Sequence, residues 1–319
     1  MKLNSSKMIF LTFLILSTLT SLNSNNWLTL WISIEINMFM FLPLLSKKKM
    51  KDQPMKYFII QSTSSSMIMV AILHNSISQT SLSQSMLLMM SMMLKLGMSP
   101  MHMWVPSIMS KMTWENCFIM TSILKIPPLI LINQMMNFKL LILPLILSLI
   151  MGSIVGLKQT SLKKVMAYSS ISNSSWMLTS FMLKKSTAMI FISIYFLMNF
   201  IIMMTLKKNN LMYMNQMNSK SIKQKMNFML SMLSISGLPP TIGFFNKWMM
   251  LKELMKNYSI LPITMILTST ISMFFYLKMT SPYLLNSVST MKNNKINKIN
   301  SFLTINILGF PLMYLLKSI

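Results

Sequence analysis

The chain is dominated by long apolar runs that follow one another from end to end. Runs of roughly 15–20 residues recur along it, which is the length of a membrane-spanning helix. Of its 319 residues 53% are hydrophobic and only 10% are charged, and the mean hydropathy is +0.57. Only structures that satisfy their own backbone polar groups can cross hydrocarbon. The sequence therefore predicts an all-α polytopic membrane protein.

Eleven spans are expected, and no gap between them has room for a soluble domain, so residues 1–319 should form a single transmembrane domain. The spans at 84–110 and 224–256 are too long for one crossing. The run after Lys2 and Lys7 lacks a small-residue cleavage site and is interpreted as a retained first span. The approximate bounds of the spans are 8–22, 27–45, 55–74, 84–110, 113–133, 138–157, 161–182, 187–206, 224–256, 258–279 and 300–317.

The lysines divide unevenly between the two sides of these spans. Counted on alternating sides, 20 share the side of the N-terminus, six lie on the other side and three fall within spans. By the positive-inside rule the N-terminus is on the positive-inside face and the C-terminus is on the opposite face. The net charge of +25 does not indicate nucleic-acid binding, because the lysines occupy short gaps between spans and arginine is absent.

Two spans contain the same helix-breaking pattern, Gly-x-x-Pro. It begins at Gly97 in LKLGMSP and at Gly237 in SGLPPTIGFFNK. Proline removes a backbone donor and clashes with the preceding turn. Each of these spans should therefore split into two half-helices, and the freed carbonyl groups need protein groups or water as partners.

The first ten spans form two predicted units of five, at approximately 7–135 and 138–280, and the C-terminal helix 300–317 lies outside both. Each break lies in the fourth span of its unit. An odd number of spans per unit gives the two units opposite orientations. Interrupted helices at matching positions of inverted units indicate a transport site near the membrane mid-plane.

Four ionisable residues lie deep within the spans: Glu35, Lys95, Lys125 and Lys247. Each charge costs at least about 2.5–3.5 kcal/mol there. The lysines could simply snorkel to the interface, and Glu35 could form a structural ion pair. The functional interpretation is a proton relay, because a Glu–Lys pair that separates or becomes hydrated can bind and release protons. Transfer against a membrane potential requires an external drive, and no redox or catalytic motif occurs in this chain.

The remaining candidate is His102, just after the first break. It could extend the relay, or it could be a neutral histidine hydrogen-bonded within the break. Metal and disulfide sites are not expected, because Cys117 is the single cysteine and His74 is distant in sequence from His102, without carboxylate companions.

Four stretches of the chain resemble the antiporter-like membrane subunits of respiratory complex I. The resemblance implies two inverted five-helix units, each with one discontinuous helix. Eleven spans suit the animal form of one such subunit, which lacks the first three helices of its relatives. The stretches are EIN (35–37) with FLPLL (41–45), LKLGMSPMHMWVP (94–106), QTSLKKVMAYSSIS (159–172) and SGLPPTIGFFNKW (236–248).

The resemblance also implies roles by position. Glu35 corresponds to the glutamate paired with a lysine on the first broken helix, here Lys95. Lys125 corresponds to the central lysine, and Lys247 to the lysine that leads towards the next subunit. His102 corresponds to the histidine of the proline–aromatic–histidine stretch of the family.

This chain departs from the family pattern at two places. Ile123-Leu124 stands where relatives often have Trp-Gln before the central lysine, and Asn173 stands where many carry histidine. The first change removes a side chain that could hold water, and the second removes a titratable group. The second half would then depend on water and hydroxyl groups.

The resemblance implies a proton-translocating subunit of NADH:ubiquinone oxidoreductase in the mitochondrial inner membrane, with the matrix at the positive-inside face. No cofactor is expected in this chain, since other subunits would handle NADH, FMN, iron–sulfur clusters and ubiquinone. The expected partners are other membrane subunits of complex I and the lipid bilayer, not nucleic acid. Two alternatives stay open: a cation/proton antiporter subunit, and a structural subunit whose ion pairs assist assembly.

Overall fold

The computed structural model describes residues 5–46, 52–77, 81–135, 138–213, 216, 222–239, 241–256 and 258–288. In these ranges the regular elements are helices, apart from an isolated bridge between Ser161 and Tyr213. The all-α class is confirmed for the described residues. The C-terminal helix expected at 300–317 lies outside them.

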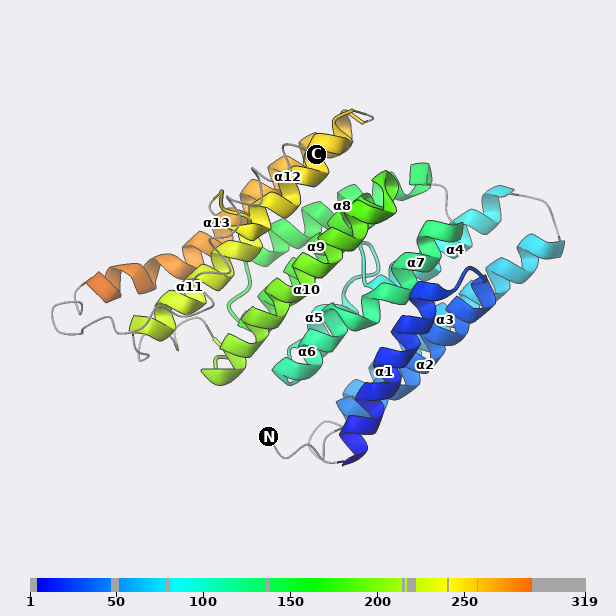
Figure 1. The fold of residues 1–319 in the computed structure, drawn as a ribbon, viewed down its shortest axis with the longest axis horizontal. Helices are drawn as coiled ribbons and strands as arrows, with labels where there is room; N and C mark the ends of the chain where they lie inside the picture. Colours follow the sequence, from blue (N-terminus) through cyan, green and yellow to red (C-terminus); the bar gives the residue numbers. More distant parts are fainter. Residues whose placement is uncertain are drawn as a thin grey trace. The chain divides into compact units, whose positions relative to one another are not determined.

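The chain divides into two compact units, Met1–Ser148 and Leu149–Ile319 (Figure 1). The helices of the first unit are α1 (Ser5–Asn23), α2 (Trp27–Leu45), α3 (Asp52–Ile77), α4 (Ser81–Leu96), α5 (Trp104–Met109), α6 (Trp114–Thr121), the 3₁₀ turn η1 (Ile123–Lys125) and α7 (Ile126–Met135). Helix α8 (Phe138–Leu157) crosses the boundary between the units. The second unit continues with α9 (Leu162–Leu183), α10 (Lys185–Lys208), α11 (Ile222–Ser236), α12 (Ile242–Leu254) and α13 (Ile260–Val288).

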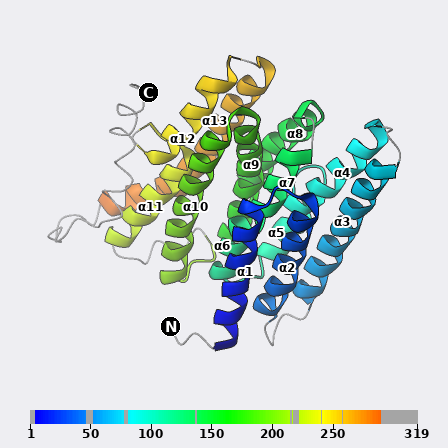
Figure 2. The same cartoon turned by 45° about the vertical axis from the view of Figure 1, so that its right-hand side comes forward.

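In the first unit α3 is the neighbour of both helices that carry a candidate charge. It packs along α2, which contains Glu35, and along α4, which contains Lys95, and it also contacts α5 (Figures 1 and 2). Buried apolar side chains such as Phe41, Ile68 and Met92 fill the space between these helices. This packing brings residues distant in sequence to the first helix break.

In the second unit α9 is the most deeply buried helix, although it is rich in serine. It contacts α10 and α12, and α11 contacts α10, α12 and α13. The hydroxyl groups of Ser169 and Ser170 donate to the carbonyls of Met166 and Ala167, both at 2.8 Å. Because such internal hydrogen bonds satisfy the hydroxyl protons, a polar helix can occupy the centre of a membrane bundle.

Among the described residues, seven helices are long and apolar enough to cross a membrane. They match the expected spans at 8–22, 27–45, 55–74, 113–133, 138–157, 187–206 and 258–279. The helix expected at 161–182 also forms, as α9, but its serines, Asn173 and two lysines lower its hydropathy. The spans at 84–110 and 224–256 each divide into two shorter helices, as predicted.

The two helix breaks share two backbone features. Gly97 and Gly237 adopt positive φ angles of 66° and 84°. Glycine accepts such angles without steric cost. The next amide hydrogen-bonds five residues back in both cases, from Met98 to the Met93 carbonyl at 3.0 Å and from Leu238 to the Leu233 carbonyl at 3.4 Å. This bond is part of the Schellman pattern that ends a helix. The glycine amides differ, because that of Gly97 donates to the Leu94 carbonyl and that of Gly237 donates to the Leu233 carbonyl. The Gly-x-x-Pro pattern therefore marked both ends correctly.

The sequence interpretation missed a third irregularity, in the span expected as a continuous helix at 113–133. Helix α6 ends at Thr121, η1 follows, and α7 begins at Ile126. Pro127 and Pro128 occupy the first turn of α7, where their missing amides are tolerated. The adjacent prolines were the signal, and they separate Lys125 from the regular helix after it.

Gly243, the second residue of α12, lies directly against the end of α11. A Cβ atom at Gly243 would stand 1.7 Å from the Ser234 carbonyl oxygen. Gly243→Ala should therefore destabilise the second unit by roughly 2–3 kcal/mol. At Gly156 the nearest atom is 3.4 Å away, and Gly156→Ala is the matched control with little expected effect. Thermal unfolding of the membrane-extracted protein measures both, and equal stability of the two variants would contradict this account.

Candidate functional site

The first candidate cluster joins α2 and α4. Lys95 is 6% exposed in the last turn of α4, and the Glu35 carboxylate interacts with its ammonium group electrostatically. Within the described residues neither Lys95 Nζ nor Glu35 Oε1 has a hydrogen-bond partner. The two groups therefore influence each other through their charges without a direct bond between these atoms.

Neighbouring side chains satisfy the carbonyls freed at the first break. The Trp104 indole N–H donates to the Leu94 carbonyl at 3.0 Å, and the Gln61 amide donates to the Lys95 carbonyl at 3.5 Å. The expectation that protein groups would pair with freed carbonyls is confirmed at these two positions. Both bonds fix the backbone on which Lys95 stands.

Tyr57 is a buried residue of this cluster that the sequence interpretation did not select. It interacts electrostatically with Glu35, and its ring lies 5.3 Å from that of Phe41 and 6.2 Å from that of Trp104. Tyr57 and Gln61 are four residues apart on α3 and so share one helix face. That spacing of two polar groups within an apolar helix was the available signal.

His102 lies inside the first break and is 3% exposed. Its Nδ1 is 3.2 Å from the Pro100 carbonyl oxygen, which belongs to the same break. This contact is the one expected if the ring supports the break, and the use of His102 in a relay stays a prediction.

Lys125 is 6% exposed and ends the 3₁₀ turn η1. Its amide donates to the Ser122 carbonyl at 3.1 Å, and the turn contacts α1, α2 and α7. The first unit thus contains Glu35, Lys95, His102 and Lys125, and Lys247 belongs to the second.

Lys247 in α12 is held at the second break by two uncharged groups. Its Nζ donates to the carbonyl of Ser236 at 2.7 Å and lies 5.8 Å from the centroid of the Trp176 ring. Ser236 is the last residue of α11, where the helix dipole is negative and stabilises a cation. The face of an indole ring also attracts an ammonium group.

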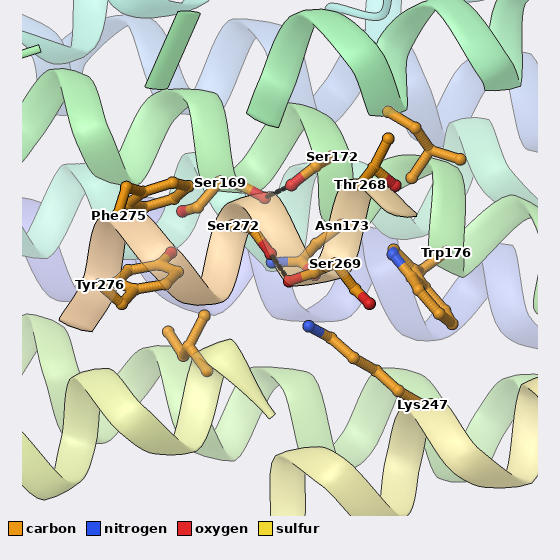
Figure 3. Close-up of a pocket in the computed structure, with 12 residues that line it drawn as sticks. Ser169, Ser172, Asn173, Trp176, Lys247, Thr268, Ser269, Ser272, Phe275 and Tyr276 are labelled. Carbon is orange, nitrogen blue, oxygen red and sulfur yellow. Dashed lines mark hydrogen bonds between the residues drawn. The ribbon is translucent and has the colours of Figure 1, made fainter. Parts of the chain in front are cut away.

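The ammonium end of Lys247 points into a polar pocket between α9, α12 and α13 (Figure 3). Ser172 donates to the Ser169 carbonyl at 2.9 Å, and Ser272 donates to the Ser269 carbonyl at 2.8 Å. Because these protons are used within the helices, the hydroxyl oxygens keep lone pairs that can accept hydrogen bonds. The polar residues of the lining are Ser169, Ser172, Asn173, Lys247, Thr268, Ser269, Ser272 and Tyr276.

A second pocket of the same unit adjoins Lys247 and is bordered by Tyr195, Ser234 and Asn246. Lys247 and Asn173 line both pockets. The position at which many relatives carry histidine is therefore beside Lys247, and here it presents an amide. Sequence reasoning noted Asn173 as a departure but could not place it next to this lysine.

Membrane-length helices, two helix breaks with the same glycine turn, and a lysine at each break, buried at Lys95 and half-buried at Lys247, indicate an antiporter-like integral membrane protein. The model of the NADH:quinone oxidoreductase/Mrp antiporter transmembrane family matches residues 24–272. The chain belongs to this family.

Sequence relatives support the same assignment. The chain is 35% identical to NADH-ubiquinone oxidoreductase chain 2 of Locusta migratoria, over 93% of this chain and 91% of the relative. It is also 35% identical to the protein of the same name from Anopheles gambiae, over 93% and 92% of the two chains.

Solved structures share the fold at low sequence identity. A chain of respiratory complex I from Thermus thermophilus superposes with a TM-score of 0.78 at 17% identity, covering 87% of this chain and 70% of that chain. A chain of the Mrp complex from a Dietzia species gives a TM-score of 0.66 at 10% identity, covering 92% and 61%.

Proposed function

We propose that this chain is a proton-translocating membrane subunit of NADH:ubiquinone oxidoreductase, the counterpart of its relatives named chain 2. The observation that carries the proposal is the pair formed by half-buried Glu35 and buried Lys95 at the first helix break of a chain in this family. Two charges in a membrane that are not hydrogen-bonded to each other cost free energy. This cost favours a functional role in which the two groups exchange protons over a purely structural one.

In the first unit the proton carriers would be Glu35, Lys95 and Lys125, with His102 as a further candidate. Movement of α4 against α2, or entry of water between them, would alter the interaction between Glu35 and Lys95 and so release or bind a proton. Trp104 and Gln61 hold the backbone at Lys95 and would limit this movement to the side chains.

In the second unit Lys247 would exchange protons with water in the hydroxyl-lined pocket. Its ammonium group has three donors, one of which is bound by Ser236. The remaining donors face a lining rich in acceptor oxygens, which suits hydrogen-bonded water. This arrangement supports the expectation that water and hydroxyl groups serve here in place of a histidine.

The drive would come from outside the chain. Moving one charge against the membrane potential requires about 2.3 kcal/mol per 100 mV. Quinone reduction in other subunits would supply it, and those subunits would handle NADH, FMN, iron–sulfur clusters and ubiquinone. The proposed setting is the mitochondrial inner membrane, with the N-terminus on the matrix side and the C-terminus on the intermembrane-space side.

The proposed complete architecture has eleven spans in two inverted five-helix units, with a final helix at 300–317. The positive-φ glycine and the amide hydrogen bond to the carbonyl five residues back, which both breaks share, support it. The partners would be the adjacent membrane subunits of the complex and the surrounding lipid, not nucleic acid.

The competing function is a cation/proton antiporter subunit, which the similarity to the Mrp complex favours. Purification of the tagged chain from native membranes distinguishes the two. Recovery with an NADH-oxidising assembly is expected. Sodium-driven proton flux through the isolated chain, without any NADH-oxidising partner, would overturn the proposal in favour of the antiporter.

A further inference from the structure

The carbonyl of Leu124 has lost both of its local hydrogen-bond donors. In an α-helix the donor to a carbonyl is the amide four residues later, and in a 3₁₀-helix it is the amide three residues later. For Leu124 these residues are Pro128 and Pro127, and proline has no N–H. The loss follows from covalent structure.

The adjacent carbonyls do not share this problem. The Ile123 carbonyl accepts the amide of Ile126 through the 3₁₀ turn, and the Ser122 carbonyl accepts the amide of Lys125 at 3.1 Å. The double proline therefore leaves an acceptor at Leu124 in particular, one residue before Lys125.

The depth of Leu124 makes this acceptor significant. It is the central residue of the apolar span Trp114–Gln134, and Pro127, Pro128 and Lys125 beside it are buried. Bulk water is absent at such depth, so a carbonyl without a local donor needs one from elsewhere in the protein or from a bound water.

We infer that the Leu124 carbonyl binds a water molecule next to Lys125, in a site created by Pro127-Pro128. The departure at 123–124 removed a side chain that could hold water there, and the backbone supplies the acceptor instead. The water would be the first hydrogen-bonded group on the path to Lys125, a role that depends on the proposed function, whereas its binding to Leu124 does not.

The test is a structure of the assembled complex at a resolution that shows ordered water. Water is expected within hydrogen-bonding distance of the Leu124 oxygen in the unmodified chain and is expected to be lost in Pro127→Ala/Pro128→Ala, where two restored amides can reach that oxygen. Pro128→Ala alone restores only the α-helical donor, leaves Pro127 at the start of α7, and should also displace the water. Pro144→Ala, which removes a proline within α8, is the matched control and should retain it.

A Leu124 oxygen without water in the unmodified chain, in a map that shows other buried waters, would overturn the inference. Persistence of the water in both proline variants would overturn it as well. The inference and the proposed function can fail separately. If the proposed function is wrong, a complex with Lys125→Met pumps protons normally, although the unmodified chain still binds water at the Leu124 oxygen.

Discussion

Replacing Glu35 with glutamine is expected to leave the complex assembled and to lower NADH oxidation and proton translocation together, by about tenfold or more. Glutamine keeps the size of the side chain and one acceptor oxygen but removes its charge. Lys95 then loses the buried charge with which it interacts, and the pair can no longer exchange a proton. A tenfold loss corresponds to about 1.4 kcal/mol of transition-state stabilisation.

The measurement is NADH oxidation and proton stoichiometry in the same membrane vesicles. Glu115→Gln, at an exposed glutamate in the first turn of α6, is the matched control and should behave as the unmodified chain. Proton pumping at the unmodified level in Glu35→Gln would exclude Glu35 from the relay. Loss of assembly in Glu35→Gln alone would instead support the structural alternative, in which the charge assists folding.

Replacing Lys247 with methionine is expected to stop proton transfer through the second unit and to weaken that unit. Methionine preserves the apolar stem but removes all three ammonium donors. The Ser236 carbonyl at the end of α11 then loses its 2.7 Å hydrogen bond. The loss of that bond should cost about 1–3 kcal/mol. Translocation should fall by about tenfold or more, whereas the fall in unfolding temperature should be modest.

Lys252 provides a closely matched control on the same helix. Its ammonium group lies 5.5 Å from the Trp248 ring centroid but is exposed. Because exposed charges contribute little, Lys252→Met should change neither translocation nor stability measurably. Proton flux in reconstituted vesicles and thermal unfolding separate the two effects. Similar translocation in Lys247→Met and Lys252→Met would contradict a relay role for Lys247, even if their stabilities differed.

The positions of the helix breaks could be predicted because their cause is local. A glycine with positive φ followed by proline ends a helix whatever surrounds it, and both Gly97 and Gly237 behave in this way. The turn before Lys125 has an equally local cause in Pro127-Pro128. It was missed because the apolar run continues through it, and a hydropathy value does not depend on whether a residue has a backbone N–H.

The contacts of the charged residues could not be predicted in the same way. Sequence selected Glu35 and Lys95 by their cost in hydrocarbon, but only the packing of α3 between α2 and α4 shows Tyr57 and Gln61 beside them. Lys247 was selected with no carboxylate partner in view. Its partners proved to be the Ser236 carbonyl and the Trp176 ring.

The sequence by itself determined the helical membrane class, the broken helices and which charges lie deep, because hydrocarbon penalises every unpaired backbone group and every charge regardless of its neighbours. Only the tertiary structure decided what each charge meets. It placed Asn173 and a hydroxyl lining around Lys247, and it left Lys95 without a hydrogen-bond partner for its ammonium group among the described residues. These contacts join segments far apart in the chain, so they depend on which helices pack together, and no local pattern encodes that choice.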